Sequence, residues 1–270
     1  RVAAHGSAPD PAALDEAAEI LASAENPLII TASMGQNRAA VPALESLAER
    51  YALPVITYRP RYVNISSDHP MHMGYEPGAY LPNVDAVLVV DCDVPWIPSL
   101  HKLNPDAKVV HIGSDPHFEN YPVRGFPCDL AIRASAATAL PQLEEAMSSR
   151  EKSASGRIDD RRKKIAGIKA DQAAANQARI EEIASGAAAM DNAWVAHCLG
   201  QLKEENDILV SESQLALANL SLRNPGTYFG TSPAGGLGWG LGAGIGVKLG
   251  DRDKRVWNVV GDGSYMFGNP

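Results

Sequence analysis

The sequence predicts an α/β protein of two open parallel-sheet domains, the second of them incomplete. Three observations predict this class. Strand and helix patterns alternate through the first half of the chain, the alternation resumes in the last third, and a polar, charged stretch separates the two regions. The length of 270 residues also exceeds that of one ordinary domain. We place the domains at residues 1–147 and 186–270, joined by a linker and charged helix at 148–185.

The first domain begins with a helix and continues with strands. Asp10 is a candidate N-cap followed by Pro11, and the next residues carry apolar side chains at helical spacing. A second amphipathic pattern covers 41–53, and a last strand and helix cover 130–147. β-branched or continuously apolar runs, typical of strands buried on both faces of a parallel sheet, occupy 27–33, 54–58, 85–93 and 107–115.

The middle of the chain is strongly polar. Residues 148–164 show no hydrophobic period, so we interpret them as a linker. The run to about Ala184 is rich in alanine with alternating charge signs, which predicts a solvated helix over one or both domains. A second α/β unit then begins near Met190. It contains a helix at 191–206, a strand at 207–213, a glycine-rich region with a helix at 226–250, and a strand at 254–260 that runs into a turn.

Composition and charge limit the classes of function. The hydrophobic fraction of 45% and the charged fraction of 21% are ordinary for a globular chain, and the net charge of −8 gives no electrostatic footprint for nucleic acid or an anionic membrane. The most apolar window, 233–249, is dominated by glycine and contains Lys248, a poor match to a membrane span. Cys92, Cys128 and Cys198 form no CxxC pair and leave an odd thiol, which favours a reducing cytoplasm.

Glycine is concentrated in one segment. Ten of the 23 glycines lie between Gly226 and Gly250, so the backbone there must approach either a ligand or another element closely. One interpretation is a helix packed through small residues such as Gly242, Ala243 and Gly246. The other is a loop whose amides and carbonyls line a cofactor and lead into that helix.

A second motif lies downstream of the glycine-rich segment. The strand at 256–260 ends in Gly261-Asp262-Gly263-Ser264, at the carboxyl edge of the predicted sheet, where open α/β sheets bind ligands. The two glycines free backbone N–H groups for diphosphate oxygens, Ser264 can donate a hydrogen bond, and Asp262 supplies a hard oxygen for Mg2+. Taken alone, the motif also describes an ordinary turn after a strand.

The combination of motifs carries a family resemblance. In order and separation, VSES, RNPGTYF, AGGLGWGLGAGIGVKL and VVGDGSYMF resemble the thiamine-diphosphate enzymes of the acetolactate synthase, benzoylformate decarboxylase and pyruvate decarboxylase superfamily. In residues 1–147, the segments PLIITASMG, LAERYALPVIT, SSDHPMHMG and the Asp-Pro of HIGSDPH resemble that superfamily's middle domain. The resemblance covers nearly the whole chain except the linker helix. It implies a middle domain followed by the N-terminal part of the diphosphate-binding domain.

The resemblance implies roles for the residues of the turn. Asp262 would ligate Mg2+, and Gly261, Gly263 and Ser264 would contact the diphosphate of the cofactor.

It also implies roles for two segments upstream. Leu237 would hold the cofactor in its V shape, and the carbonyl of Gly235 would accept a hydrogen bond from the aminopyrimidine. Ser213 and Gln214 stand where the family places diphosphate-binding hydroxyls, although Gln214 and Leu215 depart from that hydroxyl-rich pattern.

The resemblance further implies the activity and the partners. The cofactors would be thiamine diphosphate and Mg2+, and the full-length protein would be a lyase or transferase that decarboxylates a 2-oxo acid or joins its acyl group to a second carbonyl. We expect a cytoplasmic homodimer or homotetramer with small-molecule partners and neither nucleic acid nor membrane. The acid-base glutamate belongs to an N-terminal pyrimidine-binding domain, and a second metal ligand, an asparagine, lies further beyond the aspartate than Asn269 does. We therefore expect an inactive fragment that contains no catalytic residue.

Two alternatives stay open. The repeated strand and helix units also fit a nucleotide- or flavin-binding oxidoreductase, with Asp91, Cys92 and Asp93 at a sheet edge, although TASMGQN lacks a full GxGxxG fingerprint. The other alternative is a non-catalytic homologue that retains the fold. The His-x-x-His pair of His69 and His72 lacks a third ligand, which favours a role in a loop over a zinc site.

Overall fold

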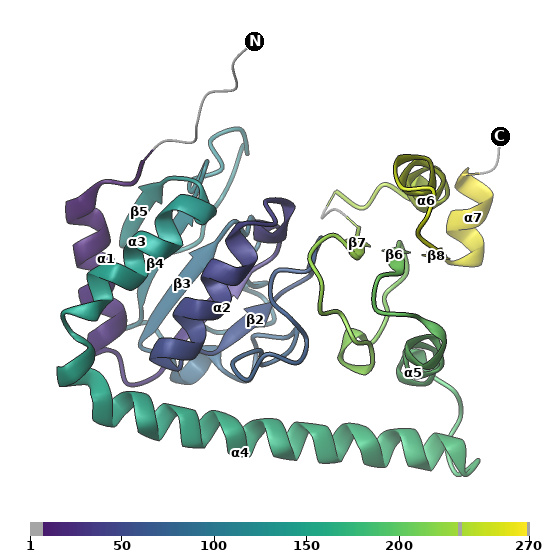
Figure 1. Cartoon of the computed structure of the whole chain (residues 1–270), viewed down its shortest axis with the longest axis horizontal. Coiled ribbons are helices and arrows are strands. Elements are labelled where there is room, and N and C mark those ends of the chain that lie inside the picture. The colour runs from purple at the N-terminus through teal and green to yellow at the C-terminus, as the bar shows by residue number, and fades with distance from the viewer. Residues whose placement is uncertain (1–7, 232–233, 269–270) are drawn as a thin grey trace.

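The computed structural model describes residues 8–231 and 234–268. Two α/β units lie beside each other, and one long helix runs along the base of both (Figure 1). The predicted class, α/β with two open parallel sheets, is confirmed. No helix within the described ranges combines the length and hydrophobicity that crossing a membrane requires.

The first unit is built on a parallel sheet of five strands. Neighbours in the sheet follow the order β2-β1-β3-β4-β5, so the chain first extends the sheet to one side of β1 and then to the other. Every residue of β1, β2 and β3 is buried, as expected for strands covered on both faces. The strands are β1 (Pro27–Thr31), β2 (Val55–Thr57), β3 (Ala86–Val90), β4 (Lys108–Gly113) and β5 (Leu130–Arg133).

Three helices of this unit pack against one another. They are α1 (Pro11–Ser23), α2 (Ala40–Tyr51) and α3 (Ala136–Ser148), and α3 contacts both of the others. The predicted start of α1 is confirmed, because the Asp10 carboxylate accepts hydrogen bonds from the backbone N–H groups of Ala12, at 2.8 Å, and Ala13. Short 3-10 turns lie at Met34–Gln36, Leu81–Asn83 and, in the second unit, Leu217–Asn219.

The interpretation of residues 148–164 as a linker without periodicity is wrong. A continuous helix of 34 residues, α4 (Glu151–Ala184), includes most of this stretch. Ala154, Ile158, Arg161 and Ile165 are buried at intervals of one and two helical turns, so the helix has a docked face. Two of these four buried positions are occupied by an alanine and an arginine. Because neither is a large apolar residue, the hydrophobic pattern is not visible in the sequence.

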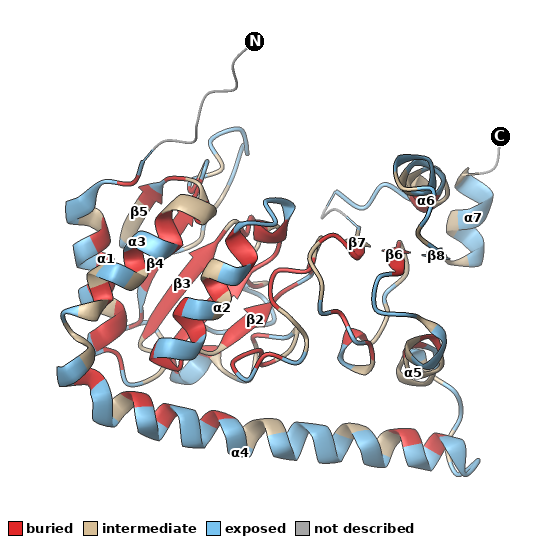
Figure 2. Ribbon diagram, viewed as in Figure 1, coloured by how far each residue is buried: buried red, intermediate tan, exposed pale blue. Residues whose placement is uncertain are grey.

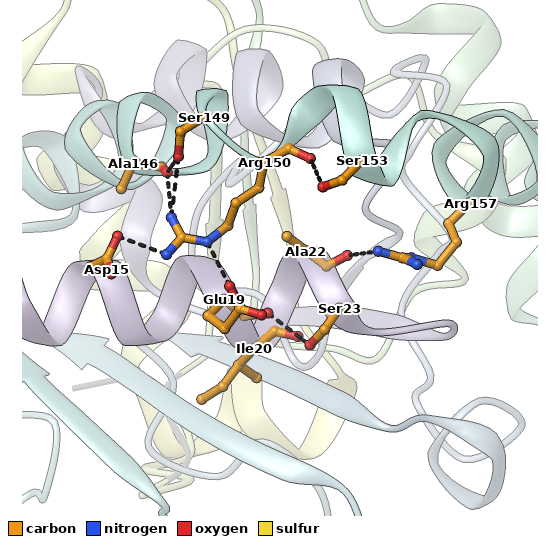
Figure 3. Close-up of polar contacts among 10 residues, drawn as sticks. All are labelled: Asp15, Glu19, Ile20, Ala22, Ser23, Ala146, Ser149, Arg150, Ser153 and Arg157. Atoms are coloured by element: carbon orange, nitrogen blue, oxygen red, sulfur yellow. Dashed lines mark hydrogen bonds and ion pairs between the residues drawn. The ribbon is translucent and has the colours of Figure 1, made fainter.

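Arginine side chains attach α4 to the first unit. At its start, Arg150 donates to Glu19 at 2.7 Å and pairs with Asp15 at 2.9 Å, both on α1 (Figure 3). About two helical turns further, Arg157 donates to the carbonyl of Ala22 at 2.9 Å (Figure 3). The last carbonyls of a helix have no partner within the helix, so Arg157 satisfies an acceptor that α1 leaves open.

The second unit has a smaller parallel sheet of three strands. The order is β7-β6-β8, with β6 in the centre. Two elements differ from the predictions: β7 was not expected, and the glycine-aspartate turn opens directly into a short helix, α7. The elements are α5 (Asn192–Leu202), β6 (Ile208–Ser211), β7 (Tyr228–Gly230), α6 (Trp239–Gly250), β8 (Val256–Val259) and α7 (Asp262–Gly268).

The two units contact each other directly. The backbone N–H of Ser67 donates to the carbonyl of Leu222 at 3.0 Å, and the N–H of Gly230 donates to the carbonyl of Arg61 at 2.9 Å. Val63 of the first unit lies in the hydrophobic core of the second. A loop of the first unit thereby fixes β7, which precedes the glycine-rich loop.

Candidate functional site

The candidate site lies at the carboxyl edge of β6 and β8. The strands pair in parallel with Ser211 opposite Val259, so the segments that follow them leave the sheet side by side. The backbone N–H of Glu212 donates to the carbonyl of Val259 at 2.9 Å, and that of Ser213 to the same carbonyl at 3.3 Å. A Cβ added to Gly261 would lie 3.6 Å from the Ser213 hydroxyl. The structure thus brings two of the predicted segments together.

One carboxylate joins these strand ends to the glycine-rich loop. Glu212 accepts the backbone N–H of Gly238 at 2.6 Å on one oxygen and that of Gly240 at 2.8 Å on the other. The hydroxyl of Ser264 donates to the same carboxylate. Burial acts to raise the pKa of Glu212, but the three donors together hold that pKa below its ordinary value of 4.5. We call Glu212 with these three donors the Glu212 clasp.

Two glycines fit the Glu212 clasp only because they lack a side chain. A Cβ at Gly240 would lie 2.8 Å from the Glu212 carboxylate, a distance that no real side chain occupies. Gly238 has a φ of +93°, in the left-handed region, and lies against the backbone of Phe267 and Gly268 on α7. The backbone here therefore follows a path that other residues resist.

The glycine-rich segment contains both a loop and a packed helix, and the lining of a cofactor by that loop stays a prediction. Residues 234–238 form a loop, while α6 packs on the sheet through Gly240 and Gly244, the latter against Asn258. The expectation that Gly242 and Gly246 would form the packed face is wrong, because no atom lies within 4 Å of a Cβ added at either position. The helical period places the packed face on the other glycines.

Asp262 stands at the start of α7 with its side chain exposed to solvent. Its carboxylate accepts the N–H of Gly263 at 2.8 Å. Among residues 8–231 and 234–268, no atom lies within 4 Å of a Cβ added at Gly263, so these residues leave the space beside this turn open. Among the residues described, no three His, Cys, Asp or Glu side chains are grouped as a metal site. Asp262 would therefore be the single carboxylate ligand supplied at this turn.

The remaining predicted site residues lie on the open side of the edge. Gly235 has a φ of +63°, and Leu237 is 62% exposed although its side chain is large and apolar. Gln214 is also exposed, whereas Ser213 is half-buried. The assigned contacts of Ser213, Gln214, Gly235 and Leu237 with a cofactor stay predictions. Asn269 lies outside the described residues.

The carboxyl edge of the first sheet offers little space. A cavity of about 10 Å3 beside Asp91 and Cys92 has room for about one water. Asp93 is buried, accepts from Tyr121 at 3.0 Å and pairs with Arg61 at 2.5 Å. Burial raises the pKa of Asp91 to about 6. These carboxylates hold the loops together.

The two histidines of the His-x-x-His pair have protein partners. The ring of His72 lies 3.1 Å from the hydroxyl of Thr57, and Nδ1 of His69 accepts the backbone N–H of Met71 at 3.2 Å. Burial lowers the pKa of His72 to about 4, so its ring is neutral near pH 7. Both residues serve the loop that follows β2.

Fold and site together define an α/β protein with a glycine-lined edge beside a single exposed carboxylate. Two family models match it: the central domain of thiamine pyrophosphate enzymes over residues 14–143, and their C-terminal TPP binding domain over 210–269. The chain belongs to the thiamine-diphosphate-dependent enzyme superfamily.

Individual relatives agree with this membership. A Pseudomonas aeruginosa protein named as a probable 2-ketoarginine decarboxylase is 28% identical over 270 residues, which cover 94% of this chain and 44% of the relative. Benzoylformate decarboxylase of the same organism is 37% identical over 71 residues, 25% of this chain and 13% of that protein. The structure of benzoylformate decarboxylase from Polynucleobacter necessarius matches with a TM-score of 0.70 at 18% identity, over 99% of this chain and 49% of that one. The chain spans half or less of these proteins.

The residues present fit thiamine diphosphate with Mg2+. Mg2+ is commonly held by one or two carboxylates together with phosphate oxygens and water, and Asp262 beside the open space at Gly263 meets that requirement. The hydroxyl of Ser264 can donate one hydrogen bond, and here it donates that bond to Glu212. To donate to a diphosphate oxygen instead, the hydroxyl would have to rotate away from Glu212.

Sequence reasoning missed Glu212. Its signal was present, because Glu212 directly follows a buried strand and precedes Ser213 at the carboxyl edge, where ligand-binding residues gather. What could not be seen is that its two oxygens lie within reach of amides 26 and 28 residues further along the chain.

Proposed function

We propose that the protein containing this chain is a thiamine-diphosphate- and Mg2+-dependent enzyme that decarboxylates a 2-oxo acid or transfers its acyl group to a second carbonyl. One observation carries the proposal. The Glu212 clasp holds the glycine-rich loop and the Gly261-Asp262-Gly263 turn at one sheet edge, each with its backbone near an open space.

The proposal assigns a task to each part of that edge. Asp262 would hold Mg2+, and the amides of Gly261 and Gly263 would face the diphosphate. The exposed Leu237 would support the cofactor by an apolar contact, and the carbonyl of Gly235 would accept a hydrogen bond from it. When bound, the cofactor supplies a carbon nucleophile and an electron sink for the decarboxylated acyl group.

A diphosphate site at the carboxyl edge of the second sheet would require its backbone amides to be held in fixed orientations. A diphosphate carries several negative charges, and amides hold such a group best when they are already oriented, because no binding energy is then lost in ordering them. The Glu212 clasp would contribute to this order indirectly, since Ser264, the residue after Gly263, donates to the same carboxylate that holds the neighbouring loop. Glu212 would thus act as a positioning residue.

The names of the relatives support a 2-oxo acid as the substrate. The Pseudomonas proteins are named for decarboxylation of 2-ketoarginine and of benzoylformate. The same proposal includes Mg2+ dependence and a homodimeric or homotetrameric assembly. It also places the acid-base glutamate and the second metal ligand on segments outside this chain. The cytoplasmic location expected from the cysteines, and the inactivity expected of the chain alone, stay predictions.

Carbon dioxide release by the full-length protein tests the proposal. Pyruvate, benzoylformate and 2-ketoarginine would be supplied with thiamine diphosphate and Mg2+, with each cofactor omitted in turn. We expect release from at least one acid only when both are present, and its loss in Asp262→Ala but not in Asp253→Ala, an exposed residue of the same unit. Release that persists after both cofactors are removed contradicts the proposal, and so does the absence of release and of carboligation with every acid.

A further inference from the structure

A cavity of about 350 Å3 lies between α4 and the amino-terminal edge of the first sheet. It is far from the carboxyl edge of the second sheet in the chain and in the fold, and no part of the proposed function uses it. Apolar side chains form most of its walls: Pro27, Leu28, Pro54, Met73, Ala79 and Val84 from the first unit, with Ile165 and Ile168 from α4.

The size and chemistry of this cavity distinguish it from a packing defect. Protein interiors seldom contain voids larger than a water molecule, and small-molecule sites begin at about 300 Å3. Such sites combine apolar walls with a few placed polar groups. Here the polar groups come from both sides, with Glu25, Asn26 and Asn83 on the first unit. From α4, Lys164 donates to the side chain of Asn26 at 2.9 Å, and Gln172 donates to the hydroxyl of Tyr80 at 2.9 Å.

The most unusual group in the wall is Arg161. Only 7% of this residue is exposed. Its terminal nitrogens donate to the carbonyls of Ala24, at 2.9 Å, and Tyr51, at 2.7 Å, while its Nε is buried and has no hydrogen-bond partner. A buried polar group without a partner is costly, so this position is arranged for more than the two contacts it has.

Two positive side chains, Arg161 and Lys164, and one carboxylate, Glu25, line the cavity, so the charge of its lining is net positive. Within the described part of the chain, no carboxylate lies within 4 Å of the charged nitrogens of Arg161 or Lys164. The nearby Asp85 is occupied, because it accepts the backbone N–H groups of Glu25 and Asn26. Burial, aided by the neighbouring Arg157, lowers the pKa of Arg161 to about 10, although Asp85 and Glu25 act in the opposite direction.

We propose that this cavity binds a small monocarboxylate with an aliphatic chain. The carboxylate would lie at Lys164, with the charge of Arg161 behind it, and the chain would extend along Leu28, Ile165 and Ile168. Because one wall is α4, which also contacts α5 of the second unit, an occupied cavity would strengthen the attachment of the connecting helix to the first unit.

Isothermal titration of the chain with octanoate tests the proposal. We expect saturable binding with a Kd of about 1 mM or tighter, because a ligand with this few non-hydrogen atoms has only a modest binding free energy. Octylamine, which has the same chain and a positive head group, should not bind. Lys164→Met should weaken octanoate binding about tenfold. Lys163→Met is the matched control, because that side chain is 80% exposed, and it should leave the Kd unchanged.

Substitutions that fill the cavity with a large side chain provide a second test of the proposal. Ile168→Trp should abolish octanoate binding while the circular dichroism spectrum stays native, and Ala79→Phe fills the opposite wall if the tryptophan variant does not fold. Loss in a folded filled variant supports the site. Equal binding of octanoate and octylamine, unchanged binding in the filled variant, or no saturable binding to the native chain overturns it.

Discussion

The two units of the molecule differ in how their elements are held. In the first unit the central strands are wholly buried, and Leu88 in β3 is 0% exposed. In the second unit no residue of β8 or α7 is buried, and Met266 and Phe267 are 68% and 73% exposed (Figure 2). The apolar side chains of α7 thus lie on the surface of this chain, although the second unit has a buried cluster of its own around Leu209 and Leu220.

Within this chain, the glycine-rich loop and α7 bury little apolar surface. Hydrogen bonds connect both of them to the edge of the sheet. The Glu212 clasp does this with one side chain. A site held in this way depends on few atoms, and single substitutions should separate its stability from that of the first unit.

The largest expected effect is on the core of the first unit. Leu88→Ala should lower the free energy of unfolding by about 2–5 kcal/mol, because the substitution leaves a cavity among fully packed strands. Met266→Ala, at an exposed position of α7, should change it by about 0.5 kcal/mol or less. Urea unfolding followed by circular dichroism measures both. Equal losses in the two variants would show that α7 is packed as firmly as β3.

The next effect concerns the Glu212 clasp. Glu212→Ala removes the acceptors of two amides, and the lost hydrogen bonds correspond to about 1.5 kcal/mol of local stability. Hydrogen exchange at the amides of Gly238 and Gly240 should then be about tenfold faster. Glu205→Ala, an exposed glutamate of the same unit, is the control. Unchanged protection of both amides in the Glu212 variant would show that Glu212 does not hold the glycine-rich loop in place.

The smallest effect is on pH dependence, and its sign differs between the units. The folded pKa of Asp91 is raised from 3.8 to about 6 by burial, so its contribution is present at low pH and is lost as the pH rises through about 6. The pKa of Glu212 is lowered, so its contribution is lost as the pH falls below its ordinary value of 4.5.

Asp91→Asn tests the first of these signs. Asparagine tolerates the φ of +43° and carries no charge, so the variant should be more stable than the native chain at pH 7 and equally stable at pH 3.5. Thermal unfolding at the two pH values, with the exposed Asp106→Asn as the reference, measures this gain. A stability gain of the same size at both pH values would mean that the charge of Asp91 is not its cause.

The sequence predicted more of the first unit than of the second for a physical reason. Strands buried on both faces, such as 85–93, are visible as continuous apolar runs, and the Asp10 N-cap is a local signal. β7 has three residues and α4 docks through arginine stems and alanine, so neither has a readable pattern.

The candidate site shows the same division. The turn at Asp262 and the glycines were found because they are local motifs. The Glu212 clasp was not, because its partners at Gly238 and Gly240 are distant in sequence and are recognised only by their backbone amides. Which glycines pack α6 also depends on the helix rotation against Asn258, which the motif does not contain.

The central claim is that the glycine-lined edge beside Asp262 holds the metal and diphosphate of the cofactor. Isothermal titration of the full-length protein with thiamine diphosphate and Mg2+ measures this directly, in the native protein, in Asp262→Ala and in the control Asp253→Ala. We expect Asp262→Ala to weaken cofactor binding about tenfold or more, which is the loss typical of a charged ligand contact. Asp253→Ala should leave the affinity for the cofactor unchanged. Equal affinity in all three proteins would contradict the central claim.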